Sequence, residues 1–235
     1  MLKKRIIPKL QMRLSKVGGE DILTVINTVN FDKYTIVGSP ISQAKIYQSQ
    51  AADELIFLDI DSHLHSKEVL LDIIKAASEE IFMPMTVGGG VDSVDYIREL
   101  LRNGADKISI NTAAVEDNQI ITDASNYFGS QCVVVGIDYS KNNANNENLV
   151  MTHGGTVKTD IDPVKWAKVV ESLGAGEILL TSIDRDGMHN GLDLELISII
   201  SSSVSIPVIA SGGCGKASHF INGFLKGGAD AIAAG

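Results

Sequence analysis

The stretch IFMPMTVGGGVDSVDYIRELLRNGADKISI (81–110) decides the fold, because the chain contains it twice. A second copy, VSIPVIASGGCGKASHFINGFLKGGADAIA (204–233), follows 123 residues later at the proline and double glycine, and 124 residues later at Gly-Ala-Asp. ADELIFLDID (52–61) recurs likewise as GAGEILLTSID (174–184). A repeat of about half the chain predicts two half-barrels, about 1–125 and 126–235, within a single domain. The alternative is that glycine turns recur by chance.

Short apolar runs alternate with amphipathic stretches along the rest of the chain. Helices are expected at 41–52, 66–81, 94–104, 118–129, 163–174, 194–203 and 216–228, and Asp162 before Pro163 is a helix N-cap signal. Strands are expected at 5–11, 55–61, 84–88, 107–111, 133–138, 177–183, 207–211 and 230–234. Eight strands with seven intervening helices favour an α/β fold of the (β/α)8 TIM-barrel class over an open sheet.

Three segments depart from an ideal barrel. Residues 13–40 are far longer than a usual strand-to-helix loop, so we expect a lid there. KNNANNENLV (141–150) is expected to be a solvated loop. The sequence given stops at Gly235, directly after the eighth strand. The eighth helix is therefore expected to be missing from this chain, and the natural sequence to continue.

Composition excludes several classes of partner. The chain has 235 residues, 44% of them hydrophobic, and a net charge of −9, which argues against nucleic acid and anionic membranes as ligands. Cys132 and Cys214 form no disulfide framework, and neither they nor the five histidines have metal-ligand spacing. No signal peptide or membrane-spanning stretch is recognisable. We expect a cytoplasmic protein without a metal or cofactor.

The active site of such a barrel lies at the carboxyl ends of its strands. Two glycine-rich turns at repeat-related places each offer free N–H groups to a phosphate, so a ligand phosphorylated at both ends is expected. The alternative is that these glycines are only structural. The phosphate-binding candidates are Gly90, Asn111, Thr112, Asp186, Gly187, Gly212, Gly213, Ala234 and Gly235; the candidates for lining the substrate are Asp59, Thr181 and Ser211.

Four charged residues fall at the opposite ends of the strands. Arg5, Glu54, Lys107 and Glu177 begin the first, second, fourth and sixth expected strands. Two cations and two anions could close a neutral ring across the barrel floor, since buried charges must be paired. The alternative is four solvated residues at strand entries.

Several motifs resemble those of a known protein family. RIIPKL, DELIFLDI, TVGGGV, GADKISINTAAV, FGSQCVVVGID, GAGEILLTSIDRDG and IPVIASGG, which extend along the whole chain, closely resemble the cyclase subunit of imidazole-glycerol-phosphate synthase. The resemblance implies a heterodimer in which a glutaminase subunit docks on the barrel floor. Ammonia released there would pass the gate formed by Arg5, Glu54, Lys107 and Glu177, and Asp106 would belong to the partner-facing surface.

The resemblance also implies the chemistry at the far end. The family adds ammonia to a bisphosphorylated aminoimidazole carboxamide ribonucleotide, using one aspartate on the first strand and one on the fifth as general acid and base. Asp138 matches the second aspartate. Gln11 stands where the first should be, and glutamine has no proton to exchange near neutral pH.

Gln11 leaves three interpretations open. The first is a diverged paralogue that supplies ammonia to a third, adenylating amidotransferase, which makes an acetamidino sugar for surface polysaccharide such as lipopolysaccharide. The second is the histidine-pathway cyclase itself, with Gln11 tolerated. The third is a non-catalytic conduit that binds and stimulates the glutaminase.

Overall fold

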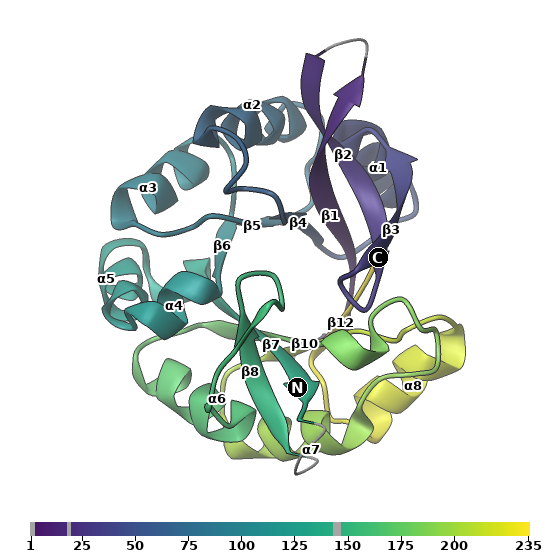
Figure 1. Cartoon of the computed structure of the whole chain (residues 1–235), viewed down its shortest axis with the longest axis vertical. Coiled ribbons are helices and arrows are strands. Elements are labelled where there is room, and N and C mark those ends of the chain that lie inside the picture. Colours follow the sequence, from purple (N-terminus) through teal and green to yellow (C-terminus); the bar gives the residue numbers. More distant parts are fainter. Residues whose placement is uncertain (1–2, 18–19, 143–146) are drawn as a thin grey trace.

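Eight parallel strands close into a barrel in the computed structural model, which describes residues 3–17, 20–142 and 147–235. Hydrogen bonding between β12 and β1, and between β10 and β7, completes the ring seen end-on in Figure 1. The strands are β1 (Arg5–Val17), β4 (Leu55–Asp59), β5 (Met85–Gly88), β6 (Lys107–Ile110), β7 (Val133–Lys141), β10 (Glu177–Ser182), β11 (Val208–Ser211) and β12 (Ala231–Ala234). This confirms the predicted TIM barrel.

The seven expected helices surround the barrel. They are α1 (Pro40–Ser49), α2 (Lys67–Ser78), α3 (Val94–Arg102), α5 (Gln119–Phe128), α6 (Pro163–Ser172), α7 (Leu194–Ser203) and α8 (Ala217–Leu225). Asp162 caps α6 as predicted, because its Oδ1 accepts a hydrogen bond of 2.8 Å from Lys165 N. A further short helix, α4 (Thr112–Glu116), was not anticipated. Across the described ranges, no helix is long and apolar enough to cross a bilayer.

Alternation along each strand sorts the side chains into two cores. The larger core lies between strands and helices and includes Phe57 and Val135. The smaller core fills the barrel interior with Ile7, Ile56, Val134, Leu179, Ile209, Ala231 and Ala233. Since strand side chains alternate between faces, the inward row of β1 also contains Arg5, Lys9 and Gln11. Asp138 and Thr181 extend the inward rows of β7 and β10 in the same way.

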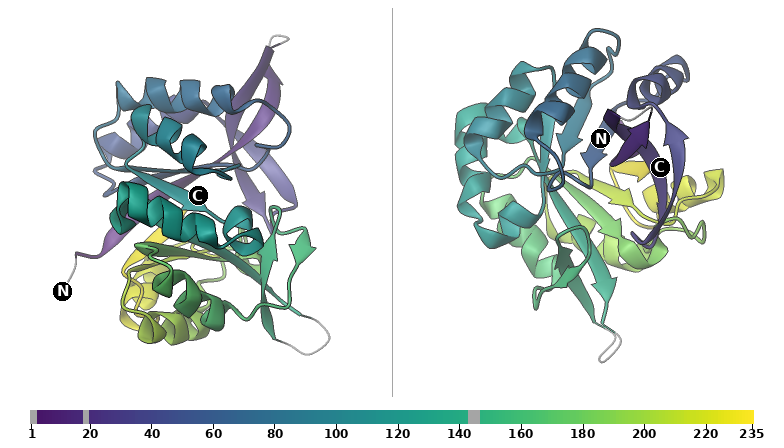
Figure 2. Two further views of the ribbon diagram at one scale, coloured as in Figure 1. Left: turned by 90° about the vertical axis from the view of Figure 1, so that its left-hand side faces the viewer. Right: turned by 45° about the horizontal axis from the view of Figure 1, so that its top comes forward.

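The prediction of a lid loop at 13–40 was wrong. The first strand continues to Val17 and pairs antiparallel with β2 (Glu20–Val29), which pairs in turn with β3 (Lys33–Gly38); residues 18–19 lie outside the described structure. We call β2, β3 and the part of β1 beyond Gln11 the arm. Figure 2 shows the arm projecting from the side of the barrel opposite the N-terminus. Pairing between its strands satisfies many of the peptide groups of the arm.

The second half of the chain carries a similar extension. The end of β7 pairs antiparallel with β8 (Asn148–Thr152), which pairs with β9 (Val157–Lys158). The expectation of a loop at 141–150 was therefore wrong at both of its ends, and 143–146 lie outside the described residues. Each half thus bears an antiparallel extension after its own first strand, on the same side of the barrel (Figure 2).

The glycine turns show the same packing in both halves. A Cβ on Gly89 would lie 2.3 Å from the Asp59 carbonyl oxygen, and one on Gly212 would lie 2.4 Å from that of Ser182. Both glycines also have positive φ. Because Asp59 and Ser182 are themselves 123 residues apart, the repeat conserves a backbone contact that only glycine permits.

Candidate functional site

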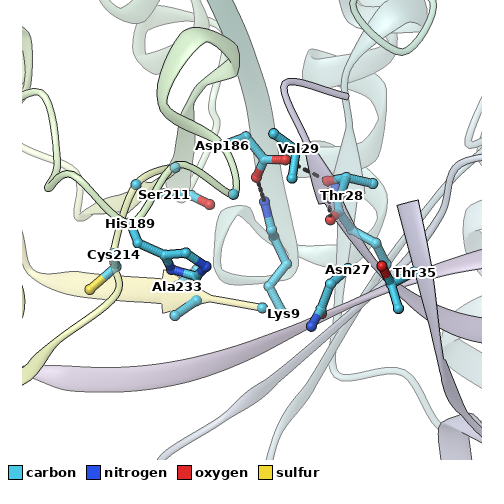
Figure 3. Close-up of a pocket in the computed structure, with 16 residues that line it drawn as sticks. Lys9, Asn27, Thr28, Val29, Thr35, Asp186, His189, Ser211, Cys214 and Ala233 are labelled. Atoms are coloured by element: carbon cyan, nitrogen blue, oxygen red, sulfur yellow. Dashed lines mark hydrogen bonds and ion pairs between the residues drawn. The ribbon is translucent and has the colours of Figure 1, made fainter. Parts of the chain in front are cut away.

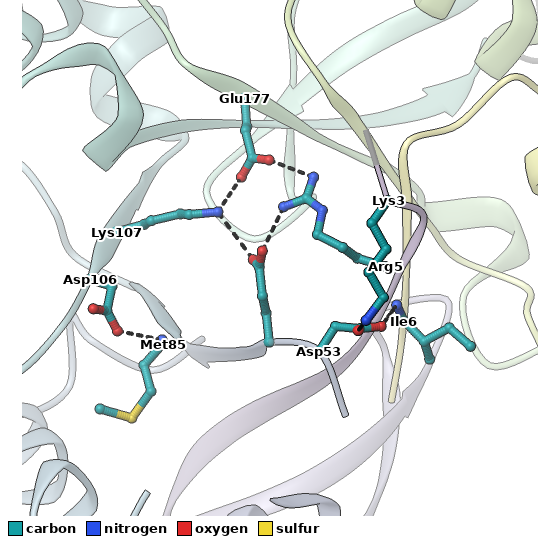
Figure 4. Close-up of polar contacts among 9 residues, drawn as sticks. Lys3, Arg5, Ile6, Asp53, Met85, Asp106, Lys107 and Glu177 are labelled. Carbon is teal, nitrogen blue, oxygen red and sulfur yellow. Dashed lines mark hydrogen bonds and ion pairs between the residues drawn. The ribbon is translucent and has the colours of Figure 1, made fainter. Parts of the chain in front are cut away.

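A closed ring of ion pairs lies at the floor of the barrel. Arg5 contacts Glu54 at 2.8 Å and Glu177 at 2.6 Å, while Lys107 contacts the same two carboxylates at 3.1 Å and 2.8 Å. Figure 4 shows Arg5, Lys107 and Glu177 turned toward one another, with dashed lines marking the ion pairs of the ring. All are largely buried, so each charge needs the others. The structure therefore brings together the four residues that the sequence placed at strand entries.

Asp106 sits at the edge of this floor, immediately before Lys107. It is exposed, and its Oδ2 accepts a hydrogen bond of 2.8 Å from Met85 N (Figure 4). This bond fixes the carboxylate beside the ring. A partner bound beneath the barrel would meet Asp106 in a defined orientation.

A pocket of about 330 Å³ opens at the other end of the barrel. It brings together most of the residues that were predicted to bind phosphate or to line the substrate. These residues lie far apart in the sequence (Figure 3). The predicted residues that line it are Gln11, Asp186, Gly187, Ser211, Gly212, Gly213, Ala234 and Gly235. The pocket is lined mainly by the second half of the chain and the arm.

The first-half phosphate candidates lie outside this pocket. Thr112 accepts a hydrogen bond of 2.9 Å from His153 N, so the extension after β7 covers it. Asn111 points instead toward Asp138 and donates a hydrogen bond of 2.7 Å to its Oδ2. Gly90 packs against the Ser62 side chain. The two predicted phosphate turns therefore have unequal surroundings in this conformation.

Asp59 takes no part in lining the pocket. It alternates with Leu58, which packs into the barrel interior, so its carboxylate faces the helix layer. There its Oδ2 lies 2.9 Å from His65 Nε2, an ion-pair contact that is poorly aligned for a hydrogen bond. Burial raises the pKa of Asp59, opposed by the neighbouring imidazole. The site prediction for Asp59 finds no geometric support.

Asp138 is the predicted acid or base that the structure surrounds with polar groups. Desolvation raises the pKa of its half-buried carboxyl to about 6, against the opposing effects of Lys9 and of hydrogen bonds from Thr181 and Asn111. A group with a pKa near neutrality can both accept and return a proton at working pH. The raised pKa is consistent with the acid or base role predicted for Asp138.

Gln11 belongs to a hydrogen-bond chain rather than to an acid–base pair. Its Oε1 lies 2.9 Å from Thr28 Oγ1, which also contacts Asp186 Oδ2. A hydroxyl has one proton, so Thr28 can donate to only one of them. Turning the Gln11 amide by 180° places its N–H against Thr28 and leaves the Thr28 proton for Asp186. A neutral amide satisfies this chain, whereas a second carboxylate would compete for the same proton.

The arm reaches the pocket through this chain. Asn30 N donates a hydrogen bond of 2.9 Å to the Asp186 carbonyl oxygen. A Cβ on Gly187 would lie 2.1 Å from the Thr28 carbonyl oxygen, so glycine allows the arm its close approach. Asn27, Thr28, Val29 and Thr35 of the arm line the pocket. These contacts could not be predicted from the sequence, because they depend on where the arm folds back.

Lys9 is another pocket residue that the sequence analysis did not predict. It is 3% exposed, lines the pocket, and has its Nζ 3.9 Å from Asp186 Oδ1 (Figure 3). Its orientation could have been predicted from RIIPKLQM (5–12). Lys9 and Gln11 are two residues apart on a buried strand, so their side chains must face the same side. A lysine in that row implies a charge inside the barrel.

Comparisons with known proteins identify the family of this chain. A family model described as "Histidine biosynthesis protein" matches residues 5–235. The imidazole glycerol phosphate synthase subunit HisF of Methanococcus vannielii is 45% identical over 250 residues, which cover 98% of this chain and 89% of the relative. The chain belongs to the HisF family. HisF proteins of Methanococcus maripaludis strains C7 and C5 are 45% and 44% identical over the same shares.

Proposed function

We propose that this HisF-family chain is the ammonia-accepting synthase subunit of a glutamine amidotransferase, and that a separate glutaminase docks on its floor. The main observation in support of this proposal is the ion-pair ring. Arg5, Glu54, Lys107 and Glu177 surround the barrel axis at the end opposite the pocket. A polar ring at this level is unnecessary for packing, since apolar side chains would fill it at less desolvation cost.

The barrel interior suits neutral ammonia. Above the ring lies a layer of apolar side chains that includes Ile7, Val134 and Leu179, followed by the polar residues of the mouth. A path along six strand residues is roughly 20 Å long. Ammonium would lose its hydration in such a layer at high cost, whereas neutral ammonia would not. The ring would thus admit ammonia at the floor, and Asp138 would receive it at the mouth.

The finer proposal concerns the reaction. Gln11 cannot exchange a proton, and losing one acid–base group costs about 10²–10⁴ in rate. The Gln11–Thr28–Asp186 chain gives this glutamine a defined structural role. We therefore favour a diverged reaction, in which the ammonia is used to convert an N-acetyl sugar into an acetamidino sugar together with an adenylating amidotransferase.

The histidine-pathway cyclase remains the second candidate. It is favoured by the 45% identity to HisF proteins over 98% of the chain. In that case Asp138, with a pKa near neutrality, would act with a water molecule in place of the first-strand acid. The substrate would be the bisphosphorylated aminoimidazole carboxamide ribonucleotide.

One assay separates these candidates. The chain alone is incubated with that ribonucleotide and excess ammonium salt at mildly alkaline pH, so that no glutaminase is needed. We expect turnover at least a hundredfold below that of a HisF protein carrying both aspartates, and an increase in the Gln11→Asp variant. Rapid formation of imidazole glycerol phosphate by the unaltered chain would establish the cyclase instead.

The conduit interpretation predicts a different pattern in the reconstituted complex. Asp138→Asn would leave glutaminase stimulation and pathway output unchanged, while charge reversal at Arg5 or Lys107 would abolish both. If this chain takes part in the chemistry, Asp138→Asn abolishes product formation but preserves glutamine hydrolysis. Measuring glutamate and final product in the same reaction distinguishes the two patterns.

A further inference from the structure

Lys9 is a buried ammonium whose hydrogen-bonding capacity is largely unused. It carries three N–H donors and is 3% exposed. Its closest partner among the described residues, Asp186 Oδ1, lies 3.9 Å from Nζ, beyond hydrogen-bond length. Lys9 lines the pocket, so a group bound there can accept hydrogen bonds from its Nζ.

Ser211 offers a second unused donor to the same pocket. Its side chain is 4% exposed, and its Oγ has no hydrogen-bond partner in the described part of the chain. Strand β12 separates β11, which holds Ser211, from β1, which holds Lys9, and places the short side chain of Ala233 between them. Figure 3 shows Ser211 and Lys9 bordering one opening above Ala233. Two donors, of which the Ser211 hydroxyl is buried without a partner among the described residues, therefore border a common space.

The charges around this space select the kind of acceptor. Asp186 lies beside Lys9, and Lys9 also acts electrostatically on Asp138. A full anion between two carboxylates would be repelled by both. A neutral carbonyl oxygen avoids that repulsion and still accepts from an ammonium and a hydroxyl. Negative charge that develops on it during a reaction would then be stabilised by Lys9.

We propose that Lys9 Nζ and Ser211 Oγ bind the carbonyl oxygen of a phosphorylated substrate. This rests on the proposed function for the source of ammonia, and it assigns the addition of ammonia to this chain rather than to an adenylating partner. When the ammonia nitrogen forms a bond to the carbonyl carbon, the C=O π pair moves onto the oxygen, where Lys9 and Ser211 hold it. Asp138 takes one proton from the nitrogen as it gains positive charge. Lys9 thus supplies the charged group that Gln11 lacks.

Phosphate binding places the carbonyl at this position. The N–H groups of the Gly212–Gly213 turn border the same pocket, next in sequence to Ser211. A small keto phosphate held there could direct its carbonyl toward Lys9. The site therefore fits a ligand with a phosphate and a carbonyl a few bonds apart, and discriminates against the corresponding alcohol.

Binding of two small probes tests this without ammonia, glutaminase or turnover. Dihydroxyacetone phosphate and sn-glycerol 3-phosphate differ at one carbon, which is a ketone in the first and an alcohol in the second. Their dissociation constants are measured by NMR titration, following the Gly212 and Gly213 amides. A hydrogen bond from a charged donor predicts about tenfold or stronger preference for the ketone in the unaltered chain.

Three variants test whether Lys9 and Ser211 cause the preference for the ketone. Lys9→Met should reduce the preference to about one while the alcohol binds as before, and Ser211→Ala should reduce it partly. Lys45→Met removes an exposed lysine of α1 that pairs with Glu80, and should change neither constant. Methionine replaces a buried charge with an apolar chain of similar length, so Lys9→Met is expected to fold, which thermal melting verifies.

The contrary results are equally defined. Equal binding of both probes, a preference that persists in Lys9→Met, or failure of the ketone to bind would each overturn the assignment. None of these results bears on the ammonia route, because the floor ring and the glutaminase play no part in the titration. Conversely, a failed ammonium assay would leave the binding preference intact.

Discussion

Gln11 Oε1 lies 2.9 Å from Thr28 Oγ1, which ties the inward face of the first barrel strand to the arm. The same hydroxyl contacts Asp186, from a loop 158 residues further along the chain. One side chain therefore holds the arm, β1 and the loop after β10 in a fixed relation around the pocket.

The first prediction removes that hydroxyl. Thr28→Val should lower the free energy of unfolding by about 1–3 kcal/mol, because Asp186 and Gln11 lose a partner while buried. Thr28→Ser keeps the hydroxyl and is the matched control. Urea denaturation measures both variants. Equal stability of the valine and serine variants would show that the chain of hydrogen bonds contributes nothing to holding the arm.

The second prediction concerns Asp138 and pH. Its folded pKa, raised to about 6, exceeds the ordinary value, so folding favours the protonated form and the contribution of Asp138 to stability declines as pH rises through 6. Asp138→Asn removes this penalty. The variant should be more stable than the unaltered chain, and its advantage should grow by about 1 kcal/mol between pH 5 and pH 8. Denaturant unfolding at both pH values gives the difference, and an advantage independent of pH would contradict the raised pKa.

The third prediction tests whether the floor ring acts as a unit. Arg5→Gln and Glu54→Gln each leave an unpaired, largely buried charge and should each cost about 1–3 kcal/mol of unfolding free energy. The double variant restores neutrality, so its cost should be smaller than the two costs added together by at least about 0.5 kcal/mol. Strict additivity in a double-mutant cycle would mean that the four residues are independently solvated.

The fourth prediction compares two histidines of one loop. His65 pairs with the buried Asp59, whereas His63 is exposed. His65→Ala should raise the pKa of Asp59 further, because the imidazole opposes the effect of burial, and should destabilise the fold by about 1–3 kcal/mol. His63→Ala should do neither. A carboxyl titration followed by NMR measures the first effect and chemical denaturation the second; identical behaviour of the two variants would remove any role for the pair.

Much of the fold could be predicted from local pattern. The eight strands were found because buried parallel strands are short apolar runs, and glycine turns separate them from amphipathic helices. The ring of Arg5, Glu54, Lys107 and Glu177 could also be inferred, since charges at the starts of parallel strands reach the same end of a barrel. Asp59 was misplaced although the pattern was informative. Leu58 packs into the barrel interior, so its neighbour Asp59 on β4 must face outward.

The arm shows the limit of local pattern. EDILTVINTV (20–29) is rich in β-branched residues and forms β2, but the long segment 13–40 that contains it was expected to be a lid. Its strand structure depends on pairing with the extension of β1, and its position depends on the approach that Gly187 allows. The internal repeat predicts neither of these two contacts of β2.

The sequence by itself therefore determined the order of strands, the repeat of about half the chain and the charges at each end of the barrel. These follow from a side-chain period of two and from repeated turns, which are local properties of the chain. Only the tertiary structure decided that Thr28 meets Asp186 and that Lys9 and Ser211 share one opening. Those contacts join residues on different strands, and their distances depend on barrel closure and on where the arm bends.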